Sequence, residues 1–139
     1  MPIEADWLIL DHIYEIRLSG EISLADIEAL HEIDLKILER GPKNQIHAIY
    51  DFTDATGPRR VKLLDMMRLL DHDRLRRINR RRGWVILLGS HDTVLCRLYA
   101  SLMQLLRIQY RQVDTMDDAM SLLGRLAATT PLPTFARNA

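Results

Sequence analysis

Two patterns of apolar residues predict strands in this chain. Between residues 13 and 18, Tyr14, Ile16 and Leu18 alternate with more polar positions, as in a strand with one buried face. Residues 84–88 (Trp-Val-Ile-Leu-Leu) are apolar throughout, which is typical of a strand buried between two layers of helices. The predicted strands are residues 5–10, 13–18, 46–52, 84–88 and 110–113.

Segments with apolar residues at helical spacing separate these strands. Ser23 begins the first of them with Ser-Leu-Ala-Asp, a capping box in which Asp26 stands where Glu or Gln is more usual. This helix is expected to reach Arg40, because Gly41-Pro42 then stops it. The second predicted helix starts near Pro58 and continues through residue 71, after which it either breaks or extends to residue 82. The third predicted helix spans residues 93–108, and the fourth runs from a cap at residues 115–118 to about residue 128.

The predicted order is β-β-α-β-α-β-α-β-α. After an opening hairpin, strands and helices alternate, so we expect an α/β fold with a mostly parallel five-stranded sheet and four helices. The 139 residues fit a single domain, which we place at residues 1–128, and residues 129–139 are expected to form a loose tail.

Composition narrows the class of protein but names no reaction. The 19 basic and 19 acidic residues cancel, and no apolar run is long enough to predict a membrane span. The single cysteine excludes an internal disulfide, and acidic residues near the N-terminus do not fit a signal peptide, so we expect a cytoplasmic address. The five histidines form no metal-binding motif, and no catalytic motif appears, so neither an enzyme nor a cofactor is predicted.

The element order and certain local residues resemble the SpoIIAA-like proteins of the STAS and CRAL-TRIO group. The likeness extends over residues 3–126. It rests on Trp7, on residues 19–20 and 23–27 where the chain enters the first helix, on Asp51 in the strand 46–52, on the strand at residues 83–89, and on residues 114–115 and 118–119 at the start of the last helix. The resemblance implies a bacterial regulatory module that binds another protein.

The resemblance also directs attention to the turn after the third predicted strand. In anti-sigma-factor antagonists of the group, a serine in an Asp-Ser-Ser-Gly-Leu motif is phosphorylated by a partner kinase. This chain has Asp-Ala-Thr-Gly-Pro at residues 54–58, so Thr56, and next Thr53, are the candidate phosphoacceptors. Arg59 and Arg60 would attract a phosphate there. The favoured interpretation is that Thr56 caps the second helix.

Asp34 interrupts the apolar face of the first helix, and His31 lies three residues before it. A carboxylate on a buried face needs a hydrogen-bonding or charged partner. His31, or an arginine from the second helix, could supply that partner. We favour a structural pair, and the alternative is that both residues are polar contacts in a ligand pocket.

The helix predicted at 93–108 is apolar around most of its circumference, whereas a surface helix usually buries only about 100° of it. We therefore expect something beyond the sheet to cover the apolar surface of this helix. A second subunit is favoured, because homodimers are the most frequent oligomers. The alternatives are an apolar ligand or membrane surface, and unusually deep packing within the chain. The residues of this predicted oligomer or ligand face are Leu95, Leu98, Tyr99, Leu102, Met103 and Leu106.

Charge is unevenly distributed along the chain. Residues 1–40 carry ten acids and three bases, and residues 59–82 carry ten bases and three acids. The densest run holds six arginines, at positions Arg74, Arg76, Arg77, Arg80, Arg81 and Arg82. They could bind phosphates or a partner, but we favour a solvated helix end that faces the acidic first helix. No aromatic residue lies among them, which argues against a nucleic-acid stacking platform.

The function predicted from these features is a non-enzymatic STAS-like regulatory module. It would bind another protein as a homodimer, through residues 53–60 together with the arginine run. The alternative is a carrier or sensor of a small apolar or anionic ligand, held between the helix 93–108 and the sheet.

Overall fold

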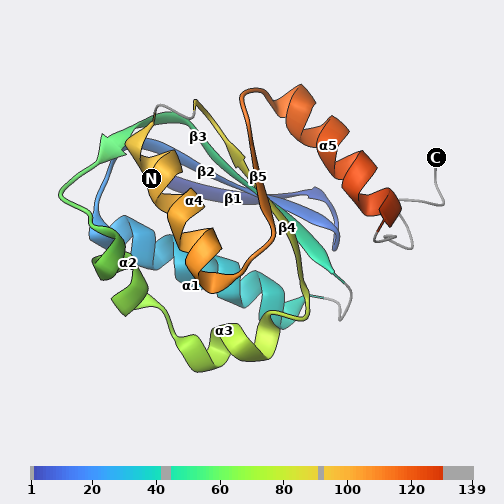
Figure 1. Cartoon of the computed structure of the whole chain (residues 1–139), viewed down its shortest axis with the longest axis horizontal. Coiled ribbons are helices and arrows are strands. Elements are labelled where there is room, and N and C mark those ends of the chain that lie inside the picture. The colour runs from blue at the N-terminus through green and yellow to red at the C-terminus, as the bar shows by residue number, and fades with distance from the viewer. Residues whose placement is uncertain (1, 42–44, 91–92, 130–139) are drawn as a thin grey trace.

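The computed structural model describes residues 2–41, 45–90 and 93–129 (Figure 1). Five strands form one sheet in the order β1-β2-β3-β4-β5, in which β1 and β2 are antiparallel and every other pair is parallel. The strands are β1 (Ile3–Ile9), β2 (Ile13–Ile22), β3 (Ile46–Pro58), β4 (Arg82–Leu88) and β5 (Tyr110–Val113). The helices are α1 (Leu24–Arg40), α2 (Leu63–Leu69), α3 (His72–Ile78), α4 (Val94–Leu106) and α5 (Met116–Thr129).

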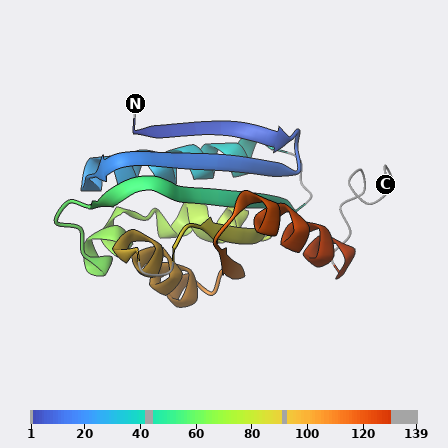
Figure 2. The same cartoon turned by 90° about the horizontal axis from the view of Figure 1, so that it is seen from above.

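Helices cover both faces of the sheet. Alternate residues of each strand point to opposite faces, so Tyr50 and Leu87 join a large core with α1 to α4, while Ile49 and Ile86 join a smaller core with α5. Figures 1 and 2 show α5 on its own side of the sheet, away from the other four helices. The predicted α/β class, the mostly parallel sheet and the buried strand at 84–88 are confirmed.

Local capping patterns locate the starts of α1 and α5. The Ser23 side chain accepts a hydrogen bond from the Asp26 backbone amide, and the Asp26 carboxylate accepts one from the Ser23 amide, which completes the predicted capping box. Thr115 accepts from the Asp118 amide at the start of α5. The predicted tail lies, after Thr129, outside the described residues.

The predicted loop at 54–58 is wrong, because β3 continues through it to Pro58. Residues 19–22 of β2, which the sequence placed beyond the hairpin, pair with residues 54–58 of β3. Two register shifts interrupt this pairing, and Gly20 and Gly57 adopt positive φ angles of 71° and 132° that other residues rarely tolerate. The two strands therefore form a ribbon, residues 19–22 and 54–58, beyond the end of β4.

The predicted second helix is two helices, which makes the helix count five rather than four. It starts at Leu63 instead of near Pro58, since the chain is still extended at Pro58. A break at Leu70-Asp71 then separates α2 from α3, and the Asp71 carboxylate caps α3 by accepting from the Arg74 amide at 3.1 Å. Within the described residues, no helix has the length and apolarity needed to cross a membrane.

Candidate functional site

A buried polar cluster joins α1 to the sheet. The Asp34 carboxylate accepts hydrogen bonds from Arg82 Nη2 at 2.6 Å, from the Tyr50 hydroxyl at 2.7 Å, and from the Tyr14 hydroxyl. All four side chains are buried, and a second Arg82 nitrogen donates to the Tyr50 hydroxyl at 3.4 Å. The predicted polar partner of Asp34 is thus an arginine, but it comes from β4 instead of the second helix.

The charge pair dominates the ionisation of this cluster. Burial by itself would raise the pKa of Asp34, but the charge of Arg82 and the hydrogen bonds from Arg82, Tyr14 and Tyr50 lower it. Burial and the neighbouring carboxylate raise the pKa of both tyrosine hydroxyls, so they stay protonated and donate. The cluster is therefore a neutralised structural unit.

His31 does not bind Asp34. Its Nε2 lies 3.3 Å from the Tyr99 hydroxyl, and burial lowers its pKa to about 4. The cavity beside these residues and α4 has a volume of about 20 Å³. That is enough for about one water molecule. The pocket expected for a lipid-like ligand between α4 and the sheet is thus filled by the protein's own side chains.

Most of the predicted face of α4 is buried inside the chain. Leu95, Tyr99, Leu102 and Met103 belong to the core between the helices and the sheet, where α2 also packs against α4. A partner could reach only Leu98 and Leu106 of the predicted set, because these two are partly exposed. Deep packing therefore accounts for most of the unusual apolar circumference.

The six arginines of the run have different surroundings. Arg74 binds Glu32 at 2.8 Å and Glu39 at 2.7 Å on α1, and Arg81 donates to the carbonyls of Leu38 and Glu39. These contacts match the predicted pairing of the arginine run with the acidic first helix. Arg82 is buried against Asp34, so it is not the exposed anion-binding residue that the sequence predicted.

The remaining arginines of the run lie at the surface. Arg76 makes an exposed pair with Asp73 at 3.4 Å, while Arg77 and Arg80 have no partner among the described residues. Together with Asp73 these three arginines line an open hollow. Arg77 and Arg80 are the members of the run that remain free to meet an anion, while Arg76 shares its charge with Asp73.

Thr56 is exposed on the ribbon of β2 and β3, and Thr53, which precedes the ribbon on β3, is also exposed. Thr56 does not cap α2, because that helix begins seven residues later and its N-cap position is Lys62, which makes no side-chain cap bond. Of the two arginines that follow, Arg59 lies 4.0 Å from Glu21, and Arg60 has no partner among the described residues.

The ribbon and the end of the arginine run lie at opposite ends of the sheet. Arg82 pairs in register with Ile46, where β3 begins, whereas Thr56 lies ten residues further along β3. At 3.3 Å per residue this corresponds to about 33 Å. The prediction of one working surface that combines residues 53–60 with the arginine run is therefore wrong for Arg80 to Arg82.

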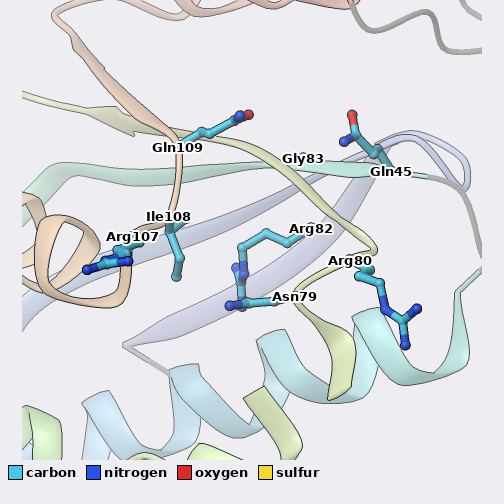
Figure 3. Close-up of a pocket in the computed structure, with 8 residues that line it drawn as sticks. All are labelled: Gln45, Asn79, Arg80, Arg82, Gly83, Arg107, Ile108 and Gln109. Atoms are coloured by element: carbon cyan, nitrogen blue, oxygen red, sulfur yellow. The ribbon is translucent and has the colours of Figure 1, made fainter. Parts of the chain in front are cut away.

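A polar pocket of about 280 Å³ lies where α3 leads into β4 and where α4 leads into β5 (Figure 3). Sequence reasoning singled out Arg80 and Arg82 but missed its other polar residues. Asn79 follows α3, Gln45 precedes β3, and Arg107 and Gln109 lie between α4 and β5, so only the fold brings these residues together. Within residues 2–41, 45–90 and 93–129, no three His, Cys, Asp or Glu side chains are placed to hold a metal ion.

Comparison with known proteins identifies the fold. No protein-family model and no curated protein matches the sequence. Solved structures do match, and three of them cover 87% of this chain. The first is an uncharacterised DUF3478-family protein with a SpoIIAA-like fold from Shewanella loihica PV-4, with a TM-score of 0.57, 16% identity and 91% of its chain covered. The chain has a SpoIIAA-like fold.

The other two structures are of SpoIIAA itself. The unphosphorylated form of this anti-sigma factor antagonist matches with a TM-score of 0.59, 17% identity and 95% of its chain covered. The phosphorylated form of the Bacillus cell fate determinant SpoIIAA matches with a TM-score of 0.54, 14% identity and 98% coverage. These likenesses support the SpoIIAA part of the sequence resemblance, while its CRAL-TRIO part stays a prediction.

Proposed function

We propose that this SpoIIAA-like protein is a non-enzymatic regulatory module that binds another protein through the ribbon of β2 and β3. The observation that carries the proposal is an open strand edge. Pairing between β3 and β4 ends at Asp51 and Leu88, yet β3 continues to Pro58. Among the described residues, no strand pairs with the far side of residues 53–58.

An open edge of this kind suits recognition of an extended peptide. Unpaired backbone amides and carbonyls can add a strand from a partner, and side chains on alternate positions select it. Thr53 and Thr56 are exposed on this edge, and Arg59 and Arg60 follow it. The partner segment is therefore expected to be extended and acidic.

Phosphorylation of Thr56 would act on this edge by charge. A phosphate there gains nothing from the α2 N-terminus, since a helix end stabilises a charge only within its first turn. It would instead add negative charge beside the partner segment. In this proposal, phosphate on Thr56 weakens the binding of an acidic partner.

A photo-crosslinking experiment tests the partner surface. A benzophenone amino acid at position 56 should crosslink a distinct protein on irradiation in the native cells, because residue 56 lies on the open edge. The same group at Glu28, an exposed position on α1, is the control and should not crosslink that protein. Identical products from both positions, or none from position 56, would contradict the proposal.

We further propose that the protein is a homodimer that forms through α4. Val94, Leu98 and Leu105 lie at helical spacing along one flank of α4, where Val94 is 50% and Leu105 58% exposed and Leu98 is only partly buried against the core. An apolar stripe on a helix is a common site of subunit contact.

Native mass spectrometry tests the dimer. The wild-type chain should give a mass of two subunits, and Leu105→Glu should give one, since a carboxylate would be buried without a partner at the contact. Leu10→Glu is the control: Leu10 is 69% exposed and lies in the β1–β2 turn, so this variant should remain dimeric. A monomeric wild type, or a dimer in all three proteins, would remove α4 as the interface.

A further inference from the structure

We infer that the polar pocket between α3 and the α4–β5 connection is a binding site for a small phosphate-bearing anion. This site is independent of the proposed partner surface, because it lies at the start of β4, about 33 Å along the sheet from Thr56. Its lining is polar and cationic. Three arginines, three carboxamides, one glycine and one isoleucine form it, and none of these eight residues is acidic.

Two of the three arginines carry charge that nothing in the described protein neutralises. Arg80 and Arg107 are exposed and form no ion pair with a described residue, whereas Arg82 is neutralised by Asp34. The pocket therefore has an excess of two positive charges. Figure 3 shows Arg80 and Arg107 on opposite sides of the pocket, with Arg82 and Asn79 between them. Rotation of two long, unpaired side chains can bring a guanidinium to an anion from each side.

The rest of the pocket is held in place by the core. Arg82 is fixed by Asp34 and Tyr50, and Ile108 is buried in the large core. The Nε atom of Arg82 is buried and has no hydrogen-bond partner in the described protein. Arg82, a residue of the pocket lining, thus keeps one hydrogen-bond donor without a protein partner, which is uncommon for a buried polar group.

Arg107 occupies a backbone position at which glycine or asparagine is usual. It ends α4 with a φ of 56° and a ψ of 39°, the left-handed conformation in which glycine or asparagine is usual. An arginine at this position accepts an unfavourable backbone conformation while its side chain remains unpaired. A role for the guanidinium in binding a ligand would account for that choice.

The size and composition of the pocket define the class of ligand. A volume of about 280 Å³ lies near the lower end of the range, roughly 300–1,000 Å³, that small-molecule pockets occupy. Such pockets are usually apolar, but here arginine and carboxamide groups provide the lining. Arginine binds phosphate oxygens through paired N–H groups, and the carboxamides can donate to further oxygens. Phosphate, pyrophosphate and a small phosphate ester all fit this chemistry.

The site is tested by titrating the full chain, labelled with ¹⁵N, with inorganic pyrophosphate at constant ionic strength. Constant ionic strength is required because salt screens weak binding at exposed arginines. The amides of Gly83 and Ile108 and the Nε–H resonance of Arg82 should shift together and saturate. Resonances of the ribbon, residues 19–22 and 54–58, should stay unchanged.

Two variants, Arg80→Gln and Arg107→Gln, should each weaken pyrophosphate binding by about tenfold to a hundredfold, the effect of losing a charged hydrogen bond. The matched control is Arg60→Gln. Like Arg107, Arg60 is exposed and without a partner among the described residues, and its φ is 53°, so it shares the charge and backbone conformation but lies far from the pocket. This variant should bind pyrophosphate as tightly as wild type.

Parallel titrations with inorganic phosphate and with glycerol 3-phosphate identify the source of the phosphate. Equal affinity for both indicates an inorganic anion, and tighter binding of glycerol 3-phosphate indicates an organic ester; either result supports the site. Absence of saturable shifts at Gly83 and Ile108 with all three anions would overturn it. The site would also be overturned if Arg60→Gln weakened pyrophosphate binding as much as Arg107→Gln does. The same holds if the Arg107→Gln variant loses thermal stability but binds pyrophosphate as tightly as wild type. In that last case Arg107 serves only the end of α4.

Discussion

Replacing Asp34 by asparagine is expected to lower the free energy of unfolding by about 3–5 kcal/mol, the usual loss when one member of a buried ion pair is removed. The amide keeps the shape of the side chain but leaves the buried guanidinium of Arg82 without a counter-charge. Its NH2 group also places a donor at one of the two acceptor positions of Asp34, either opposite Arg82 or opposite Tyr14 and Tyr50. Urea denaturation at neutral pH, followed by circular dichroism, measures the change.

Glu32→Gln is the matched control for this variant. Glu32 lies on the same helix and also binds an arginine, Arg74, but at the surface. Because exposed ion pairs contribute little, the control should be much closer to wild type than Asp34→Asn is. If the two variants lose stability equally, the buried pair does not hold α1 to the sheet as described.

The position of Asp34 shows how far sequence reasoning reaches. Helical spacing alone places its carboxylate on the buried face of α1, and burial alone requires a partner. The identity of the partner depends on which strand lies beneath α1. Arg82 is 48 residues away and reaches Asp34 only because β4 begins next to β3. No periodicity in the sequence carries that information.

The ribbon of β2 and β3 was missed for a related reason. Residues 54–58 have the composition of a turn, and local turn preference predicts a loop there. In the fold, residues 19–22 run alongside them and supply backbone hydrogen bonds that hold both segments extended. Gly20 and Gly57 accommodate the shifts in register through their positive φ angles.

The arginine run shows the same limit within the candidate site. Its six members look alike in the sequence, and their density predicts a cationic surface. The fold separates them, since Arg82 enters the core, Arg74 and Arg81 bind α1, and Arg77 and Arg80 remain unpaired among the described residues. The caps at Ser23 and Thr115 were predicted correctly, because these residues act within one turn of their own helices, whereas the cap predicted at Thr56 was wrong because α2 begins only at Leu63.

Acidification is expected to destabilise the folded protein between pH 6.5 and 4. Burial lowers the pKa of His31 and of His47 to about 4, whereas both are near 6.5 in an unfolded chain. In this interval the unfolded chain binds two protons that the folded protein excludes, so stability is complete above pH 6.5 and falls as the pH decreases. Each histidine is expected to contribute a loss of about 3 kcal/mol.

The charged neighbours change the size of this effect but not its direction. Near His31, the charge of Asp34 opposes the lowering of the pKa and that of Arg82 adds to it, while His47 faces His12. Glu15 acts in the opposite sense, because burial raises its pKa and the folded protein then binds a proton more readily than the unfolded chain. The lowered pKa of Asp34 matters only at more acidic pH, below its usual value.

Urea denaturation at a series of pH values measures this dependence, and a single variant assigns it. In wild type, the Trp84 amide donates a hydrogen bond to His47 Nδ1 at 2.8 Å. The His47→Asn variant retains an acceptor for this amide but has no group that titrates. Its stability should therefore vary about half as much with pH as that of wild type. His72→Gln alters an exposed histidine and should keep the wild-type profile. A wild-type stability that stays constant from pH 7 to 5, or a His47→Asn profile equal to that of wild type, would mean that the buried histidines do not exclude protons in the folded state.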